Sequence, residues 1–219
     1  MSNFTIITNH DSKFQKVASL TNPYNYDYAK QRGYDYLPLS LELPKDDRWY
    51  WHNIRTVIFA IEQKLSTSEW FFWIDSDAII MNKDISLESF TNEITTECFI
   101  ASIWNRSCPI QILTLSPEIT WIASDIRYPY SVIHTGAFFI RNCQKSVDAL
   151  KTVYDSPLYR KVPDLLEYLS WDEGAIAFEY MNNVEFRKLW HMVEPNRLCT
   201  AHSAYEEFFK NDTNCTFIR

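Results

Sequence analysis

Glycine is nearly absent from this sequence, which has only 3 glycines in 219 residues. Phosphate sites built from a glycine-rich loop need several glycines at fixed spacing, and neither G-x-G-x-x-G nor a Walker sequence is present. The sequence therefore gives no support to a dinucleotide-binding fingerprint or a P-loop. If the substrate carries phosphates, another feature has to neutralise their charge.

Positive charge is also scarce, because 21 Lys and Arg stand against 28 Asp and Glu, which gives a formal net charge of −7. A broad electrostatic grip on nucleic acid needs the opposite balance, so we expect no nucleic-acid partner. A net-acidic protein offers carboxylates more readily than a basic patch. A bound metal ion is then the simplest means of holding a phosphorylated substrate.

Cysteine pairs and long apolar runs are missing as well. The 5 cysteines are odd in number and include no C-x-x-C pair, which argues against a zinc site and against a disulfide framework. The first residues lack the apolar core of a signal peptide, and no apolar run approaches the roughly 18 residues that cross a bilayer. We therefore expect reduced thiols, no membrane span and a cytoplasmic location.

What the sequence does contain is apolar and aromatic, at 46% and 16% of its residues. This composition suits one domain with a sizeable core, spanning residues 1–219. Short apolar runs predict strands over residues 4–8, 34–41, 69–74, 98–104 and 134–140. Strands that alternate with helices indicate an α/β fold with a mixed, mainly parallel central sheet flanked by helices.

Helices are expected over residues 12–32, 49–65 and 163–181. The middle one is the clearest, because its apolar residues recur at alternating spacings of three and four and so share one face: Trp51, Ile54, Ile58, Ile61 and Leu65. In the first helix Pro23 is expected to interrupt the helix or to start a second one. Gly33 follows where a C-terminal cap is usual.

The strand predicted over 69–74 ends abruptly in Asp75-Ser76-Asp77. If the backbone stays extended, the two aspartates point the same way, and their repulsion raises one pKa unless a cation lies between them. Paired carboxylate oxygens suit Mg²⁺ or Mn²⁺. The competing interpretation is a turn in which one aspartate caps the next segment. Two acids after so apolar a strand favour the metal.

Several segments together resemble the motifs of GT-A glycosyltransferases, a Rossmann-like α/β fold. The segments are Tyr50-Trp51, the stretch 69–82 around Asp75-Ser76-Asp77, the stretch 134–144 that begins His134-Thr135-Gly136, and Asp172-Glu173. They span roughly residues 28–179 and are similar to those of the α-galactosyl-, α-mannosyl- and α-xylosyltransferases of the Golgi. The chain also resembles the first domain of a chlorella-virus enzyme that glycosylates a capsid protein, which implies that residues 1–219 are a domain excised from a longer viral polypeptide in the host cytoplasm.

The resemblance implies a metal site. In the family the acids of D-x-D bind Mn²⁺ (or Mg²⁺) together with the diphosphate and ribose of the donor, which implicates Asp75 and Asp77 with Ser76 between them. A late histidine often completes the metal shell, and His202 is a better candidate than His191. The donor implied is a nucleotide sugar, with a UDP-sugar favoured.

The resemblance also implies where the rest of the donor binds. The end of the first strand cradles the base, which here means Thr8 and Asn9. The T-G-x-F block lines the donor sugar and implicates Thr135, Gly136 and Ala137. A glycine inside an apolar strand marks either a close approach or a bulge, and both interpretations stay open for Gly136.

A catalytic role is predicted for Asp172, either as general base on an acceptor hydroxyl or as the carboxylate that faces the anomeric carbon. The competing interpretation of Asp172-Glu173 is a solvated helix face. Two motifs depart from the family: its W-x-K is Trp51-His52-Asn53 here, so a phosphate-facing lysine is missing, and its D-Q is Asp172-Glu173.

The function predicted is transfer of a hexose from a nucleotide-diphosphate sugar to a hydroxyl of a glycan or glycoprotein. Two alternatives remain. A metal-dependent phosphohydrolase or nucleotidyltransferase also uses paired acids, but usually needs a further carboxylate cluster or a basic phosphate grip. A lectin-like carbohydrate-binding domain would bind Ca²⁺ through the acids and stack aromatics on sugar, but that class is usually all-β.

Overall fold

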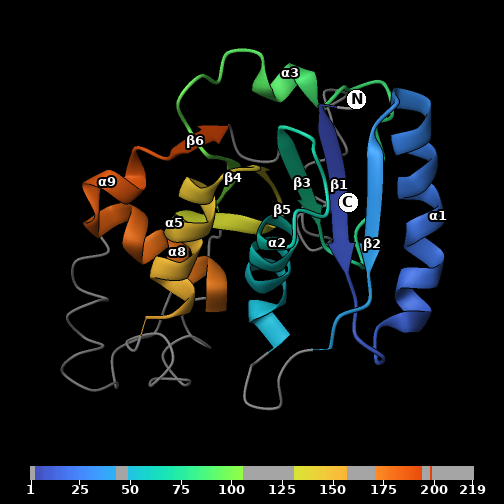
Figure 1. Ribbon diagram of the computed structural model, residues 1–219, viewed down its shortest axis with the longest axis horizontal. Helices are drawn as coiled ribbons and strands as arrows, with labels where there is room; N and C mark the ends of the chain where they lie inside the picture. Colours follow the sequence, from blue (N-terminus) through green and yellow to red (C-terminus); the bar gives the residue numbers. More distant parts are fainter. Residues whose placement is uncertain (1–2, 43–48, 106–130, 157–170, 194–197, 199–219) are drawn as a thin grey trace.

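The computed structural model describes residues 3–42, 49–105, 131–156, 171–193 and 198 (Figure 1). Six strands in this part form one sheet in the order β2-β1-β3-β5-β4-β6. They are β1 (Phe4–Asn9), β2 (Asp35–Leu39), β3 (Trp70–Ile74), β4 (Phe99–Asn105), β5 (Ser131–Arg141) and β6 (Trp190–Val193). Only β5 pairs antiparallel with its neighbours β3 and β4, while the other pairings are parallel. The predicted mixed, mainly parallel sheet is confirmed.

Helices cover both faces of the sheet (Figure 1). The helical elements are α1 (Gln15–Arg32), the 3-10 turn η1 (Trp49–Trp51), α2 (His52–Glu62), α3 (Glu88–Thr91), α5 (Gln144–Tyr154), α8 (Trp171–Asn182) and α9 (Val184–Arg187). One core cluster joins α2, α5 and α8 to one face of the sheet, and a second joins α1 and α3 to the other. This layering rules out the all-β architecture that a lectin-like domain would have.

The apolar run of β3 follows directly from these two cores. Phe71 and Trp73 belong to the cluster on the α2 side, whereas Trp70, Phe72 and Ile74 belong to the cluster on the α1 side. All five side chains are buried, because a central strand with helices on both faces has no solvent side. A polar residue in this stretch can therefore appear only where the strand ends.

α1 corrects one prediction, because it runs through Pro23 without a break. The proline removes the backbone donor that would reach the carbonyl of Ser19. Both residues lie on the exposed side of the helix, so water can satisfy that carbonyl. Gly33 caps the helix as predicted, with a left-handed φ of 73°. The helix over 49–65 begins as a 3-10 turn and ends at Glu62, which leaves Leu65 outside it at 41% exposure.

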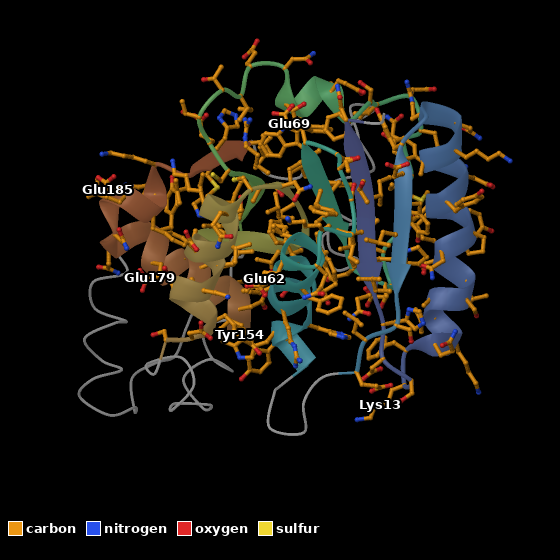
Figure 2. The ribbon with its side chains drawn as sticks, in the orientation of Figure 1. Lys13, Glu62, Glu69, Tyr154, Glu179 and Glu185 are labelled. Atoms are coloured by element: carbon orange, nitrogen blue, oxygen red, sulfur yellow. The ribbon has the colours of Figure 1, made fainter. Side chains whose placement is uncertain are left out.

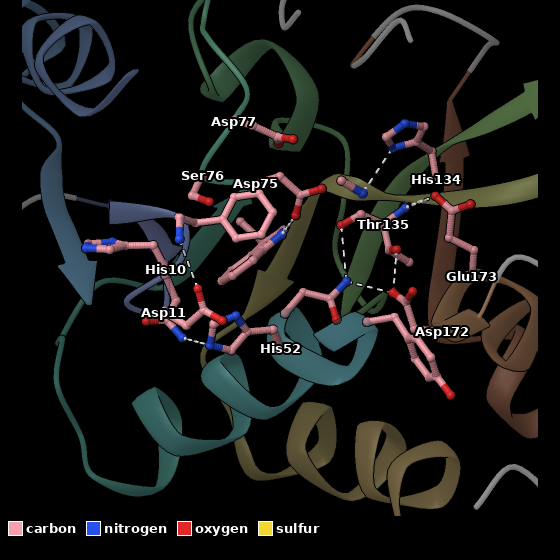
Figure 3. A pocket seen from close by; sticks show the side chains of 16 residues that line it. His10, Asp11, His52, Asp75, Ser76, Asp77, His134, Thr135, Asp172 and Glu173 are labelled. Atoms are coloured by element: carbon pink, nitrogen blue, oxygen red, sulfur yellow. Dashed lines mark hydrogen bonds between the residues drawn. The ribbon is translucent and has the colours of Figure 1, made fainter. Parts of the chain in front are cut away.

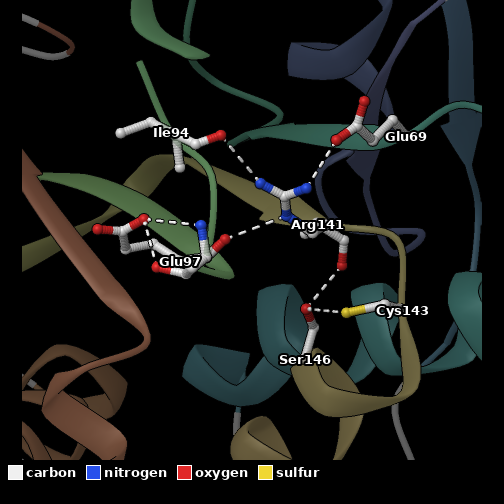
Figure 4. A network of polar contacts seen from close by, with 7 residues as sticks. Glu69, Ile94, Glu97, Arg141, Cys143 and Ser146 are labelled. Atoms are coloured by element: carbon white, nitrogen blue, oxygen red, sulfur yellow. Dashed lines mark hydrogen bonds and ion pairs between the residues drawn. The ribbon is translucent and has the colours of Figure 1, made fainter. Parts of the chain in front are cut away.

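Arg141, the last residue of β5, fastens the amino end of β3 to the segment before β4 (Figure 4). Its Nη1 lies 2.7 Å from Glu69, its Nε donates to the Glu97 carbonyl at 3.1 Å, and its Nη2 donates to the Ile94 carbonyl at 3.2 Å. The guanidinium carbon lies 4.5 Å from the centre of a Trp70 ring. All three nitrogens of the guanidinium group are engaged, so these contacts at the edge of the sheet need an arginine at this position.

Charged side chains gather on the outer surfaces of the helices (Figure 2). Glu62 of α2 pairs with Lys151 of α5 at 2.6 Å, and Glu185 pairs with Lys188 at the end of α9 at 2.7 Å. All four side chains are exposed, so these pairs contribute little to stability.

Candidate active site

A cavity of about 310 Å³ opens at the edge of the sheet where β1 and β3 end (Figure 3). Ligands in α/β folds usually bind at the carboxyl ends of parallel strands, because side chains of several strands converge there. The walls contributed by β1, β3 and their following turns hold Asn9, His10, Asp11, Asp75, Ser76 and Asp77. The walls contributed by α2, β5 and α8 hold His52, Asn53, His134, Thr135, Gly136, Asp172 and Glu173.

Asp75, Ser76 and Asp77 form a tight turn, which we call the acid turn. The predicted extended geometry is wrong, because Ala78 donates its backbone N–H to the Asp75 carbonyl at 3.0 Å and closes the chain after β3. Asp77 is exposed and Asp75 is half-buried, and both line the cavity. The chain therefore turns here, as in the competing interpretation, but no described hydrogen bond makes either aspartate side chain a cap, and the turn still brings both acids to the same cavity.

Asp75 lies in surroundings that disfavour the ionised form of its carboxyl group. Its Oδ1 accepts a hydrogen bond from the Trp73 indole N–H at 2.9 Å. Burial raises the pKa of Asp75 well above its ordinary value; the Trp73 hydrogen bond opposes this, and the negative charges of Asp77 and Asp172 add to it. A cation near Asp75 would therefore favour the ionised carboxylate.

Gly136 lies in a bulge of β5, and it is also a point of close approach. The pairing of β5 with β4 jumps from Phe138 to Ile133, so residues 134–137 have no partner in β4. A Cβ at Gly136 would lie 2.6 Å from the His134 ring and 3.0 Å from Asp75 Oδ2. The bulge interpretation is correct, the close approach is that of two side chains, and the bulge turns residues 134–136 toward the cavity.

Asp172 is fixed by a cluster that links α2, β5 and α8. Its Oδ2 accepts hydrogen bonds from Asn53 Nδ2 at 2.7 Å and from Thr135 Oγ1 at 2.6 Å. The Thr135 N–H donates to Glu173 Oε1 at 3.2 Å. Asp172 is 5% exposed and Glu173 is 9% exposed, so the solvated helix face that was the competing interpretation is wrong.

Burial raises the pKa of Asp172 to about 6, while the hydrogen bonds from Asn53, Thr135 and the backbone at the start of α8 lower it. The carboxyl group therefore changes charge in the range where a general acid or base works best. Asn53 stands where the resemblance implies a lysine, and its hydrogen bond to Asp172 gives it a structural role at this position.

Of the residues predicted to cradle the base, Asn9 lines the cavity and Thr8 does not. The Asn9 side chain is already engaged: its Oδ1 accepts from the Leu41 N–H at 2.8 Å, and its Nδ2 donates to Thr56 Oγ1 at 2.9 Å and contacts His52. The Thr8 side chain is buried within β1, and its hydroxyl finds no partner among the described residues.

Of the residues predicted to line the donor sugar, Thr135 and Gly136 reach the cavity, whereas Ala137 is packed in the core on the α1 side of the sheet. Ala137 is the partner of Ile74 in the β3–β5 ladder, so its side chain is turned away from the cavity with that of Ile74. The histidine predicted as third metal ligand, His202, lies outside the described residues.

Asp75 and Asp77 fit a hard divalent cation by their chemistry, since both offer carboxylate oxygens to one cavity and the Asp75 carboxylate has no neutralising positive charge beside it among the described residues. Within the described ranges, no group of three or more His, Cys, Asp or Glu side chains is arranged to hold a metal ion. A complete metal shell would need donors beyond these two residues, such as a ligand's phosphate oxygens.

His10 lies at the strand end where the sequence places polar residues, but sequence reasoning missed four other residues of the cavity wall: Asp11, Phe14, His52 and His134. The histidines have no metal-ligand spacing in the sequence. Two signals exist, because Asp11 closely follows the first strand and His134 precedes Thr135-Gly136. Phe14 had none: it is a single aromatic residue before α1, and only the fold brings it to this edge.

Comparisons of sequence identify relatives. The sequence model of the galactosyl transferase GMA12/MNN10 family matches residues 6–207. Probable glycosyltransferase 7 of rice (Oryza sativa) is 28% identical over 151 residues, covering 68% of this chain and 28% of the rice protein. Probable glycosyltransferase 6 of rice is 26% identical over 145 residues, covering 66% and 25%. The chain spans about a quarter of the length of the curated relatives it matches.

Solved structures share the fold. A glycosyltransferase involved in the glycosylation of the major capsid of PBCV-1 matches with a TM-score of 0.65 at 18% identity, covering 98% of this chain and 90% of that one. The galactosyltransferase LgtC, solved with donor and acceptor sugar analogs, matches with a TM-score of 0.51 at 11% identity, covering 98% and 85%. The fold is thus the GT-A fold predicted from the sequence. In the described part, no helix is long and apolar enough to cross a membrane.

Proposed function

Because the chain belongs to the galactosyl transferase GMA12/MNN10 family, we propose that it transfers a hexose from a nucleotide-diphosphate sugar to a hydroxyl group of a glycan or glycoprotein. UDP is the favoured nucleotide, and Mn²⁺ or Mg²⁺ is the proposed cofactor. The observation that carries the proposal is one cavity, at the carboxyl ends of β1 and β3, that joins the acid turn to the buried carboxyl of Asp172.

The acid turn is the proposed site of the donor diphosphate. Asp75 and Asp77 would hold the cation through their carboxylates, with Ser76 between them facing the same cavity. When bound, the cation neutralises charge on the departing diphosphate. The two acids set the position of the diphosphate end of the donor. The indole N–H of Trp73 fixes the orientation of the Asp75 carboxylate through a hydrogen bond of 2.9 Å.

The bulge of β5 is the proposed wall for the donor sugar. Thr135 and Gly136 lie between the acid turn and Asp172, and the missing side chain of Gly136 lets His134 and Asp75 pack against the wall. Because β5 is hydrogen-bonded to β3 along residues 137–141, this wall is held rigidly against the strand that carries the acid turn. A rigid wall fixes the sugar relative to its leaving group, which lowers the entropy lost at the reaction step.

Asp172 is the proposed catalytic carboxylate. During transfer, the acceptor oxygen forms a bond to the anomeric carbon, the bond from that carbon to the diphosphate oxygen breaks, and the acceptor hydroxyl loses its proton. Two roles fit a carboxylate there: it accepts that proton as general base, or it faces the anomeric carbon and stabilises positive charge. Both need the ionised form, and the donors Asn53 and Thr135 maintain it against burial.

A screen of nucleotide sugars for Mn²⁺-dependent donor hydrolysis tests the proposal. We expect at least one UDP-sugar to be turned over by the native chain, and Asp77→Ala to lose that turnover while its circular dichroism spectrum is unchanged. Asp84→Ala is the matched control, because Asp84 is an exposed aspartate in a nearby turn outside the cavity. Full turnover by Asp77→Ala would refute the role of the acid turn.

A thermal shift assay separates the proposal from a phosphohydrolase or nucleotidyltransferase. Stabilisation by UDP that depends on Mn²⁺ and is absent with ATP is expected for a UDP-sugar transferase. Equal stabilisation by ATP would favour the alternative, since such enzymes recognise the phosphates of many nucleotides.

A further inference from the structure

The buried face of α1 contacts the acid turn and the segment after it, outside the cavity. Thr21 Oγ1 donates to the Ser76 carbonyl at 2.5 Å. One helical turn further on, Asn25 Nδ2 donates to the Ala78 carbonyl at 3.0 Å, and Asn25 Oδ1 accepts from the Ile80 N–H at 3.0 Å. None of these α1 groups lines the cavity, so they do not meet the donor directly.

We propose that Thr21 and Asn25 are positioning residues that hold the acid turn in the conformation that takes up the cation and diphosphate. The inference rests on the proposed function of the acid turn and names residues that act on it from behind. Thr21 and Asn25 are spaced by four positions and so share one face of α1, which lets the helix hold the acid turn in one conformation.

The side chain of Asn25 acts like a peptide unit of a neighbouring strand. It offers one donor and one acceptor to residues 78 and 80, as a paired strand would. Asn25 is 1% exposed and Ile80 is 1% exposed, so neither amide nor backbone can exchange these bonds for water. A buried asparagine with both groups satisfied specifies one conformation strongly, because any other leaves polar groups unpaired.

The contacts bracket Asp77, which is exposed and carries the charge that the site has to present. Before it, the Asp75 N–H donates to the Gly136 carbonyl at 2.9 Å, and Thr21 holds the Ser76 carbonyl. After it, Asn25 holds Ala78 and Ile80. Without a ligand, the two acids of the turn repel each other, which favours a wider turn. The α1 contacts oppose that widening, so less order has to be gained when ligand binds.

The experiment compares variants for UDP affinity with and without Mn²⁺, measured by calorimetry on the full chain. Thr21→Val keeps the side-chain volume and removes the hydroxyl, and Asn25→Ala removes both contacts. We expect UDP affinity in Mn²⁺ to fall about 5-fold for Thr21→Val and about 10-fold or more for Asn25→Ala. Affinity without Mn²⁺ should change little, so the gain that Mn²⁺ gives should shrink.

Asn142→Ala is the matched control for lost stability. Its Nδ2 donates to the carbonyls of Ser66 at 3.1 Å and Ser68 at 2.9 Å, so the variant also loses two hydrogen bonds to backbone, but far from the cavity. An equal loss of Mn²⁺-dependent affinity in Asn142→Ala would overturn the inference, because the effect would then be general destabilisation. Native affinity in both α1 variants would also overturn it.

Asp77→Ala separates failure of the inference from failure of the proposed function. If Asp77→Ala abolishes the Mn²⁺-dependent gain while the α1 variants bind like the native chain, the function stands and the positioning role falls. If Asp77→Ala binds UDP like the native chain, the acid turn is not the site and both proposals fall. Should Asn25→Ala fail to fold, Thr21→Val alone decides the outcome.

Discussion

Removing the hydroxyl of Thr135 should move the acid limb of the pH–rate profile to higher pH. The Thr135 Oγ1–Asp172 Oδ2 hydrogen bond is 2.6 Å long and stabilises the ionised carboxylate, whose pKa is about 6. Thr135→Val keeps the shape of the side chain and loses the donor, so the ionised form is disfavoured and the pKa of Asp172 rises further. The reaction then requires a higher pH to reach full rate.

The size of the shift follows from the strength of the bond. A hydrogen bond to a charged group contributes about 1.5–3 kcal/mol and one pKa unit corresponds to about 1.36 kcal/mol, so the shift should be about one to two units. At pH 6.5 the ionised fraction would fall by about 3- to 25-fold, whereas at pH 9 it would fall by less than about 1.2-fold. The defect should therefore nearly disappear in alkaline buffer.

The assay is donor turnover at saturating donor concentration from pH 5 to pH 9, in native chain and variants. Thr5→Val is the control, because Thr5 is also a buried threonine whose hydroxyl contacts Ser66 at 2.6 Å and Ser68 at 2.9 Å, at the far end of β1. Its profile should keep the native midpoint. A Thr135→Val profile that is lowered equally at every pH would refute the reasoning, since it would mean that the hydroxyl contacts the sugar and does not tune Asp172.

Three further outcomes follow from the same structure. Asp172→Asn should abolish transfer yet stabilise the ligand-free chain by about 2–3 kcal/mol at pH 7.5. The pKa of Asp172 is raised from 3.8 to about 6 in the folded chain, which therefore binds the proton more tightly, so the stability of the native chain falls as pH rises through that interval. Urea unfolding should show the gain of the variant fading toward about pH 4. Gly136→Ala should cost about 1–3 kcal/mol and most donor turnover, because its Cβ would lie 2.6 Å from the His134 ring; a melting temperature like that of the native chain would contradict this. In the same unfolding assay, Arg141→Lys should lower the free energy of unfolding by about 2–3 kcal/mol, since a lysine cannot make the three contacts of the guanidinium group. Glu69→Gln should lower it by less than about 1 kcal/mol because Glu69 is exposed, and equal losses in the two variants would contradict this account of the network.

The strands and the layering could be predicted because they depend on burial. A run as short as Trp70–Ile74 that is apolar on both faces and bounded by polar residues favours a central strand, and the acids that follow it then mark the strand end. The helix face of Ile54, Ile58 and Ile61 was legible for the same reason, because all three are buried. Patterns of this kind are local, and the physics that produces them acts within a few residues.

The cavity was harder, because its geometry depends on contacts between distant segments. The acid turn was expected as extended backbone, and only the contact of Ala78 with the Asp75 carbonyl makes it a turn. The pairing of Asn53 with Asp172 joins positions 119 apart in sequence, and no local pattern indicates it. Thr8 lies outside the cavity because successive side chains of β1 point to opposite faces of the sheet. The sequence shows this alternation, but it does not say which of the two faces turns toward the cavity.

The direction of β5 has a consequence for how such an enzyme can diverge. β1 and β3 lead into turns at the cavity, and turns accept insertions and new residues at little cost. β5 arrives from the opposite direction and contributes its bulge, where contacts restrict replacement: a Cβ at Gly136 would meet the His134 ring, and Thr135 is hydrogen-bonded to Asp172 and Glu173. Changes in substrate preference within this lineage should therefore accumulate on the turns after β1 and β3 and at the start of α2, while the stretch 134–136 changes last.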